Sequence, residues 1–123
     1  MSNNRILLVD DERDILDLLS YHLTKEGFEV YTAEDGLEGL RKAVQLRPRL
    51  IILDYMMPQL DGLQTCLRLR EEPSLRNSIV VLLSARSEWK IVRAAFKNGA
   101  NEYIAKPISP VLFVNKVRHL LAN

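Results

Sequence analysis

The chain has 123 residues, 47% of them hydrophobic and 27% charged, which is typical of one soluble globular domain rather than of a disordered segment. Its formal net charge of +1 gives no overall field that would attract nucleic acid or an anionic membrane. No apolar run approaches the roughly 18 residues that span a bilayer, and the first five residues do not form a signal-peptide core. We therefore expect a cytoplasmic protein with neither direct nucleic-acid contact nor membrane contact.

Two hydrophobic patterns alternate along the chain: short runs rich in Ile, Leu and Val, typical of buried strands, and apolar residues three or four apart, typical of helices. In chain order they predict a strand at 6–9, a helix with Leu16, Leu19 and Leu23, an edge strand at 28–32, a helix with Leu37, Leu40, Ala43 and Val44, a strand at 50–53, a helix with Leu63, Leu67 and Arg70, a strand at 79–83, a helix at 87–98, a strand at 102–105 and a helix at 109–121. Cys66 is expected to be a packed thiol on the third helix. The alternation predicts an α/β fold, a doubly wound five-stranded parallel sheet in the flavodoxin-like order 2-1-3-4-5 with five helices.

Polar side chains stand where four of the predicted strands end. They are Asp10 and Asp11 after the first strand, Asp54 after the third, Ser84 after the fourth and Lys106 after the fifth. Each has an ordinary explanation as a cap or turn residue. However, the carboxyl ends of parallel strands meet at one edge of a sheet, and three carboxylates crowded there would repel one another unless a cation lay among them.

Oxygen ligands of this kind favour Mg²⁺. Beside such a metal, the Asp54 carboxylate would be a competent nucleophile toward a phosphoryl donor. Lys106 would neutralise charge on the phosphoryl oxygens, and the Ser84 hydroxyl could donate a hydrogen bond to one of them.

Four strings resemble the receiver-domain signature of bacterial two-component response regulators: LLVDDE at 7–12, DYMMPQLDG at 54–62, SA at 84–85 and KP at 106–107. The similarity covers the whole chain, and the stretch 106–121 is closest to receivers of OmpR-type transcription factors. The resemblance implies that residues 1–123 form one receiver domain, which a sensor histidine kinase phosphorylates on Asp54. It implies a signalling switch that catalyses only its own phosphorylation and dephosphorylation. The output is expected to be transcription, through a DNA-binding domain absent from this chain; the alternative is a stand-alone regulator that acts by protein–protein interaction.

The same resemblance implies a ligand set for the metal. Asp11 and Asp54 would bind Mg²⁺ directly, Met56 would supply its backbone carbonyl, and Asp10 would act through water.

Two positions bear on how long the phosphoryl group would stay on Asp54. Met56 and Arg86, two residues beyond Asp54 and Ser84, carry no acid or amide that could orient a water for attack on the phosphoryl group. Slow self-dephosphorylation is therefore our hypothesis.

The resemblance also implies how a phosphorylation signal would spread. Ser84 and Tyr103 correspond to the switch pair, and the bond between Lys106 and Pro107 is expected to be cis.

Two surfaces are expected to bind partners. Ile15 and Leu18 on the first helix are expected to dock the kinase. A weak homodimer, formed on phosphorylation, is expected to use Trp89, Glu102, Leu112 and Lys116.

Two other classes of protein were weighed. A phosphatase of the haloacid-dehalogenase type also uses an aspartyl phosphate and Mg²⁺, but it needs a second aspartate where Met56 stands. A flavodoxin-like electron carrier would place a phosphate loop after the first strand, where Asp10 and Asp11 would repel phosphate.

Overall fold

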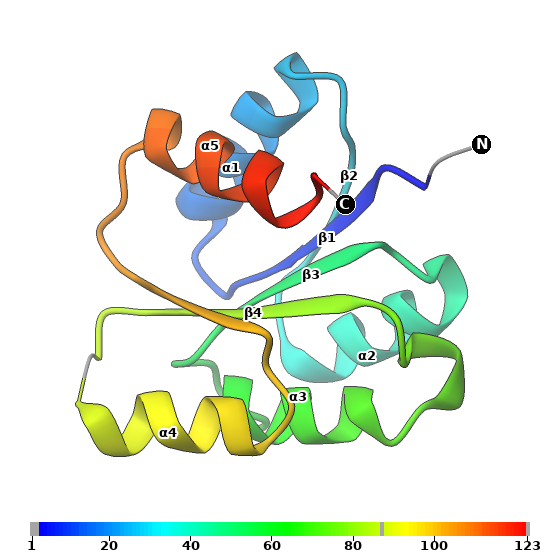
Figure 1. Cartoon of the computed structure of the whole chain (residues 1–123), viewed down its shortest axis with the longest axis vertical. Coiled ribbons are helices and arrows are strands. Elements are labelled where there is room, and N and C mark those ends of the chain that lie inside the picture. The colour runs from blue at the N-terminus through cyan, green and yellow to red at the C-terminus, as the bar shows by residue number, and fades with distance from the viewer. Residues whose placement is uncertain (1–2, 87, 123) are drawn as a thin grey trace.

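The computed structural model describes residues 3–86 and 88–122 and contains one sheet with helices on both faces (Figure 1). Its elements are β1 (Arg5–Val9), α1 (Arg13–Lys25), β2 (Glu29–Ala33), α2 (Gly36–Leu46), β3 (Leu50–Asp54), α3 (Gly62–Arg70), a 3₁₀ turn η1 (Pro73–Leu75), β4 (Ile79–Ser84), α4 (Trp89–Lys97), β5 (Glu102–Ala105) and α5 (Pro110–Leu120). All neighbouring strands pair in parallel, in the order β2-β1-β3-β4-β5. The predicted fold class and strand order are confirmed.

Alternate strand residues point to opposite faces of the sheet and build two separate hydrophobic layers. One layer contains Leu7, Val9 and the strand residues on the same side of the sheet, which pack against residues of α2, α3 and α4, including Cys66. The other layer contains Ile6, Leu8 and the strand residues on the opposite side, which pack against α1 and α5. Figure 1 shows the same division, with α2, α3 and α4 on one side and α1 and α5 on the other. Burial on both faces explains why the central strands are continuous apolar runs.

Local capping residues explain where several helices begin. Asp35 accepts a hydrogen bond from the Glu38 amide at the start of α2, and Asp61 with Gln64 forms a capping box at the start of α3. The predicted fourth helix at 87–98 is longer than the observed one, which runs from Trp89 to Lys97; residue 87 lies outside the described residues. No described helix has the length and apolar character needed to cross a membrane.

The packed face of α2 agrees only in part with the one that apolar spacing suggested. Leu40 and Ala43 pack in the core as predicted. Leu37 and Val44 are exposed, whereas the buried positions are Gly36, Gly39 and Ala43. A Cβ atom at Gly39 would lie 2.9 Å from Val9 Cγ2, which is closer than carbon atoms pack. The helix therefore approaches the sheet through its smallest side chains.

Candidate functional site

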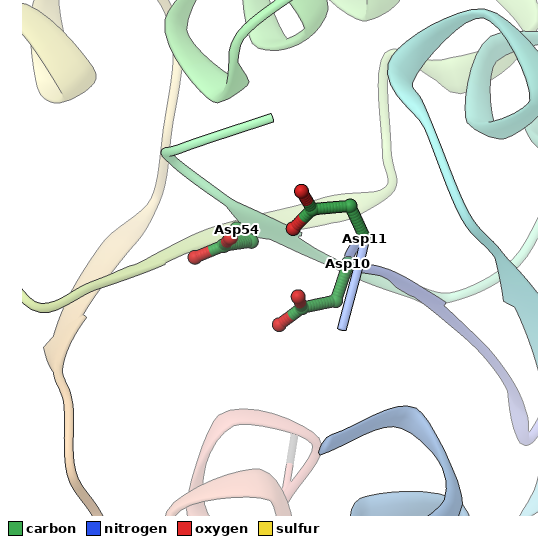
Figure 2. A group of neighbouring side chains, drawn as sticks. All are labelled: Asp10, Asp11 and Asp54. Atoms are coloured by element: carbon green, nitrogen blue, oxygen red, sulfur yellow. The ribbon is translucent and has the colours of Figure 1, made fainter. Parts of the chain in front are cut away.

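The carboxyl ends of the strands bring the predicted acidic residues together. Asp54 is the last residue of β3 and Asp10 directly follows β1, and both side chains are almost fully buried. Asp11 is exposed beside them. Carboxylate oxygens of the three residues lie within 4.8 Å of one another, and Figure 2 shows the side chains converging.

Lys106, directly after β5, spans this acidic cluster. Its Nζ atom lies 3.0 Å from Asp54 Oδ1 and 3.2 Å from Asp10 Oδ2. A third carboxylate, Glu12 Oε1, lies 3.6 Å away. Sequence reasoning counted Glu12 only as part of the acidic string, because nothing in local spacing shows that its side chain turns toward β5.

Burial and charge both act on the titration of the cluster. Burial, with the neighbouring charge of Asp10, raises the pKa of Asp54 to about 6, although Lys106 opposes the shift. Burial also raises the pKa of Asp10. For Lys106, burial is the largest single effect and favours the neutral form, but the hydrogen bonds and charges of Asp54 and Asp10 together outweigh it, and the pKa of Lys106 is raised. One lysine thus compensates the buried carboxylates only in part.

A divalent cation would compensate the negative charge that Lys106 leaves on the carboxylates of the cluster. Three carboxylates with converging oxygens are the hard-oxygen donor set that Mg²⁺ prefers. The raised pKa of Asp54 reflects burial first and then the neighbouring charge of Asp10, and a cation would offset both. The acidic cluster is therefore able to bind a metal. It opens into a hollow of about 350 Å³, lined also by Met56 and Ala85.

Ser84 ends β4 beside the cluster and is fully buried. Its Oγ atom accepts a hydrogen bond from the Arg86 amide at 2.9 Å. The Arg86 guanidinium forms an ion pair with Glu88, 2.8 Å from Nε to Oε1. The Lys106–Pro107 peptide bond, which the resemblance predicted to be cis, is cis in the structure.

Tyr103 lies one strand away from this serine, on the layer formed by α2, α3 and α4. Its ring packs against that core, and its hydroxyl is buried without a hydrogen-bond partner among the described residues. The role of Ser84 and Tyr103 as a switch pair stays a prediction.

The two predicted partner surfaces lie outside the acidic cluster. On α1, Ile15 is half-buried against the core and Leu18 is exposed. On the other surface Trp89 and Leu112 are exposed, at 65% and 60%. Glu102 and Lys116 form an ion pair within the chain, with 3.5 Å between Nζ and Oε2.

Comparison with known proteins identifies the family. Residues 6–118 match the response regulator receiver domain. Over 108 residues the chain is 42% identical to the alkaline phosphatase synthesis transcriptional regulatory protein PhoP of Bacillus subtilis, covering 88% of this chain and 44% of that protein. It is 39% identical over 117 residues to the DNA-binding dual master transcriptional regulator RpaA of Synechocystis, covering 95% and 48%. The chain thus spans about half the length of these curated relatives.

Solved structures agree with the sequence comparison. The chemotaxis protein CheY4 of Vibrio cholerae superposes with a TM-score of 0.93 at 28% identity, covering 98% of this chain and 100% of that one. The response regulator DrrB, an OmpR/PhoB homologue of Thermotoga maritima, superposes with a TM-score of 0.87 at 27% identity, covering 98% and 54%. The chain belongs to the receiver domains of two-component response regulators.

Proposed function

We propose that Asp54 accepts a phosphoryl group from a sensor histidine kinase, in a Mg²⁺-dependent reaction. The observation that carries this assignment is the position of Lys106, whose ammonium lies 3.0 Å from the Asp54 carboxylate at the floor of an open hollow. Receiver domains are phosphorylated by sensor histidine kinases. Asp10 and Asp54 are both buried and both contact this lysine, but Asp54, and not Asp10, is among the residues that line the open hollow.

Mg²⁺ would be held by Asp11, Asp54 and the Met56 backbone carbonyl, with Asp10 acting through water. When bound, it would neutralise charge on the carboxylates and on the phosphoryl oxygens. Asp11 is exposed at the rim, so a metal bound there would be open to solvent and to an incoming phosphoryl group.

In the transfer step, an Asp54 carboxylate oxygen bonds to phosphorus while the bond between phosphorus and the kinase histidine nitrogen breaks. The electron pair of the broken bond stays on that imidazole. Lys106 would pair with one phosphoryl oxygen, and the Ser84 hydroxyl would donate to another after release from the Arg86 amide. Only positioning and charge compensation are required of the chain, so it is a regulator rather than a turnover enzyme.

Labelling with acetyl phosphate and Mg²⁺ tests the assignment. Intact-mass analysis should show one added phosphoryl group on the wild type and none on Asp54→Asn. Asp17→Asn, which removes an exposed α1 carboxylate, is the matched control and should label fully. Labelling of Asp54→Asn to the wild-type extent would assign the nucleophile elsewhere.

The names of the relatives support a proposal for the process that the phosphorylated domain controls. Both curated relatives described above are named as transcriptional regulators, one of them as DNA-binding. We place the phosphorylation switch in the cytoplasm, upstream of a DNA-binding domain outside this chain; the alternative is a stand-alone regulator acting by protein–protein contact. The length of the source gene separates the two, since a stand-alone regulator would end near residue 123.

A further inference from the structure

The hollow that contains Asp54 carries more negative charge than the proposed phosphorylation requires. This acidic hollow is lined by Asp11, Glu12, Asp54, Met56, Ala85 and Lys106. Asp11 and Asp54 belong to the proposed metal site, and Lys106 would pair with the phosphoryl group. Among the charged lining residues that the structure describes, Glu12 is the one that the proposed function leaves without a role.

The backbone holds Glu12 at a fixed place on the rim of the acidic hollow. Its amide donates a hydrogen bond to Asp10 Oδ1 at 2.9 Å, and its carbonyl accepts one from the Leu16 amide at 3.1 Å. Glu12 is therefore tied both to the acidic cluster and to the first turn of α1. Its side chain is 64% exposed, so the carboxylate lies on the solvent side of the hollow.

The start of α1 does not explain where the Glu12 side chain lies. Although Glu12 is the N-cap residue of this helix, its carboxylate makes no capping hydrogen bond. A negative charge is favourable at the amino end of a helix, but Asp14 in the first turn supplies one outside the hollow. The Glu12 carboxylate instead lies 3.6 Å from Lys106 Nζ, measured from Oε1.

Charge balance makes Glu12 the surplus group of the acidic hollow. Lys106 pairs with Asp54 at 3.0 Å and with Asp10 at 3.2 Å, and both contacts are closer than its contact with Glu12. One divalent cation and the Lys106 ammonium would together compensate Asp10, Asp11 and Asp54. The negative charge of Glu12 would then remain on the solvent side, where a phosphoryl donor enters, and would act through space on an anionic donor.

We propose that Glu12 is a specificity-determining residue, which makes the acidic hollow discriminate between phosphoryl donors by their charge. The inference rests on the proposed phosphorylation of Asp54. Glu12 repels a small donor more strongly the more negative that donor is, so a free dianion reacts more slowly than the rest of the hollow would allow. A kinase is affected less, because contacts outside the hollow hold its phosphohistidine in place.

The test compares two donors that differ in charge at pH 7: acetyl phosphate, a dianion, and phosphoramidate, a monoanion. Intact mass gives the second-order rate constant for labelling of Asp54, at saturating Mg²⁺ and low ionic strength. Glu12→Gln should raise this rate constant about threefold for acetyl phosphate and less than about twofold for phosphoramidate. In about 1 M sodium chloride, where charges interact over only about 3 Å, the effect of Glu12→Gln should disappear.

Asp14→Asn is the matched control. It removes the same charge from the same end of α1, outside the acidic hollow, and should leave both rate constants unchanged. An equal factor for the two donors in Glu12→Gln, insensitive to salt, would mean that Glu12 acts by positioning Lys106, and would overturn the proposal. Equal effects of Asp14→Asn and Glu12→Gln would overturn it as well.

A second readout needs no phosphoryl donor. Titration of the ¹⁵N-labelled domain with Mg²⁺, followed by amide chemical shifts, should show binding at most about threefold weaker in Glu12→Gln. Asp11→Asn should weaken it far more. A loss in Glu12→Gln as large as in Asp11→Asn would make Glu12 a metal ligand and overturn the proposal. Failure of both donors to label the wild type would instead contradict the proposed function, and the inference with it.

Discussion

The Tyr103 hydroxyl is buried without a partner in the part of the chain that the structure describes. A buried hydroxyl that makes no hydrogen bond costs about 1 to 3 kcal/mol. We expect Tyr103→Phe to raise the free energy of unfolding by about 1 kcal/mol, measured by urea denaturation. Tyr31→Phe, at a tyrosine whose hydroxyl does bond to Glu29, is the comparison and should not stabilise the domain. A loss of stability in Tyr103→Phe would mean that the hydroxyl is satisfied.

Asp54 makes the stability of the metal-free domain depend on pH. Its pKa rises from 3.8 in an unfolded chain to about 6 in the fold, so the folded state favours the protonated carboxyl. The stabilisation is complete below about pH 4 and is lost as the pH rises through about 6. Stability should therefore fall over this window in the presence of a chelator.

Asp54→Asn should make the free energy of unfolding of the metal-free domain depend less on pH. At pH 7 it should raise that free energy by about 1 kcal/mol, after allowance for solvent screening. Thermal unfolding at a series of pH values, with and without Mg²⁺, measures both effects. Addition of Mg²⁺ should stabilise the wild type more than the variant. Identical pH profiles for the two proteins would contradict the raised pKa.

At the scale of single elements, α1 is the proposed kinase docking site. Leu18 is exposed, and Ile15 is half-buried and lines a small internal cavity together with Asp10 and Asp54. Replacing both with alanine should slow phosphoryl transfer from a histidine kinase about tenfold or more, since apolar contacts of this kind contribute about 1 kcal/mol each.

Labelling by acetyl phosphate should be unchanged in the same Ile15→Ala, Leu18→Ala variant, because small donors need no docking surface. Leu37→Ala, at an equally exposed leucine of α2, serves as the control in both assays. Equal losses with kinase and with acetyl phosphate would show that the double substitution damages the acidic site instead.

At the scale of the whole molecule, we propose that phosphorylation strengthens a weak symmetric dimer through α4, β5 and α5. Trp89 and Leu112 are large exposed apolar side chains on this surface. Glu102 and Lys116 already pair within one chain, so they have less charge to offer a second copy. The dimer should accordingly depend less on salt than one held by charged pairs.

Analytical ultracentrifugation with and without beryllofluoride, a phosphoryl mimic, measures this assembly. We expect monomers without the mimic and a monomer–dimer equilibrium with it. Tyr103→Ala should abolish the response, because in the proposed coupling the aspartyl phosphate attracts the Ser84 hydroxyl and the Tyr103 ring fills the space that this hydroxyl vacates. A domain that stays monomeric with the mimic at high micromolar concentration would exclude the dimer, and a full response in Tyr103→Ala would exclude the coupling.

Sequence by itself determined the order of strands and helices and the residues of the acidic site. Strand periodicity is a local property, and parallel strands necessarily bring their carboxyl ends to one edge, so Asp10, Asp54 and Lys106 could be assigned to a common crevice before any coordinates.

The tertiary structure decided what depends on close approach between distant segments. In the folded chain the Glu12 carboxylate lies near the Lys106 ammonium. Helix α2 packs against the sheet through its glycines, so the Leu37 side chain is exposed. The tertiary structure also brought together, at the amino ends of the strands, three segments that share no motif and that line one surface hollow. Helical spacing marks an apolar side of a helix, but the distance at which two elements pack depends on the side chains of both, and no single segment encodes that distance.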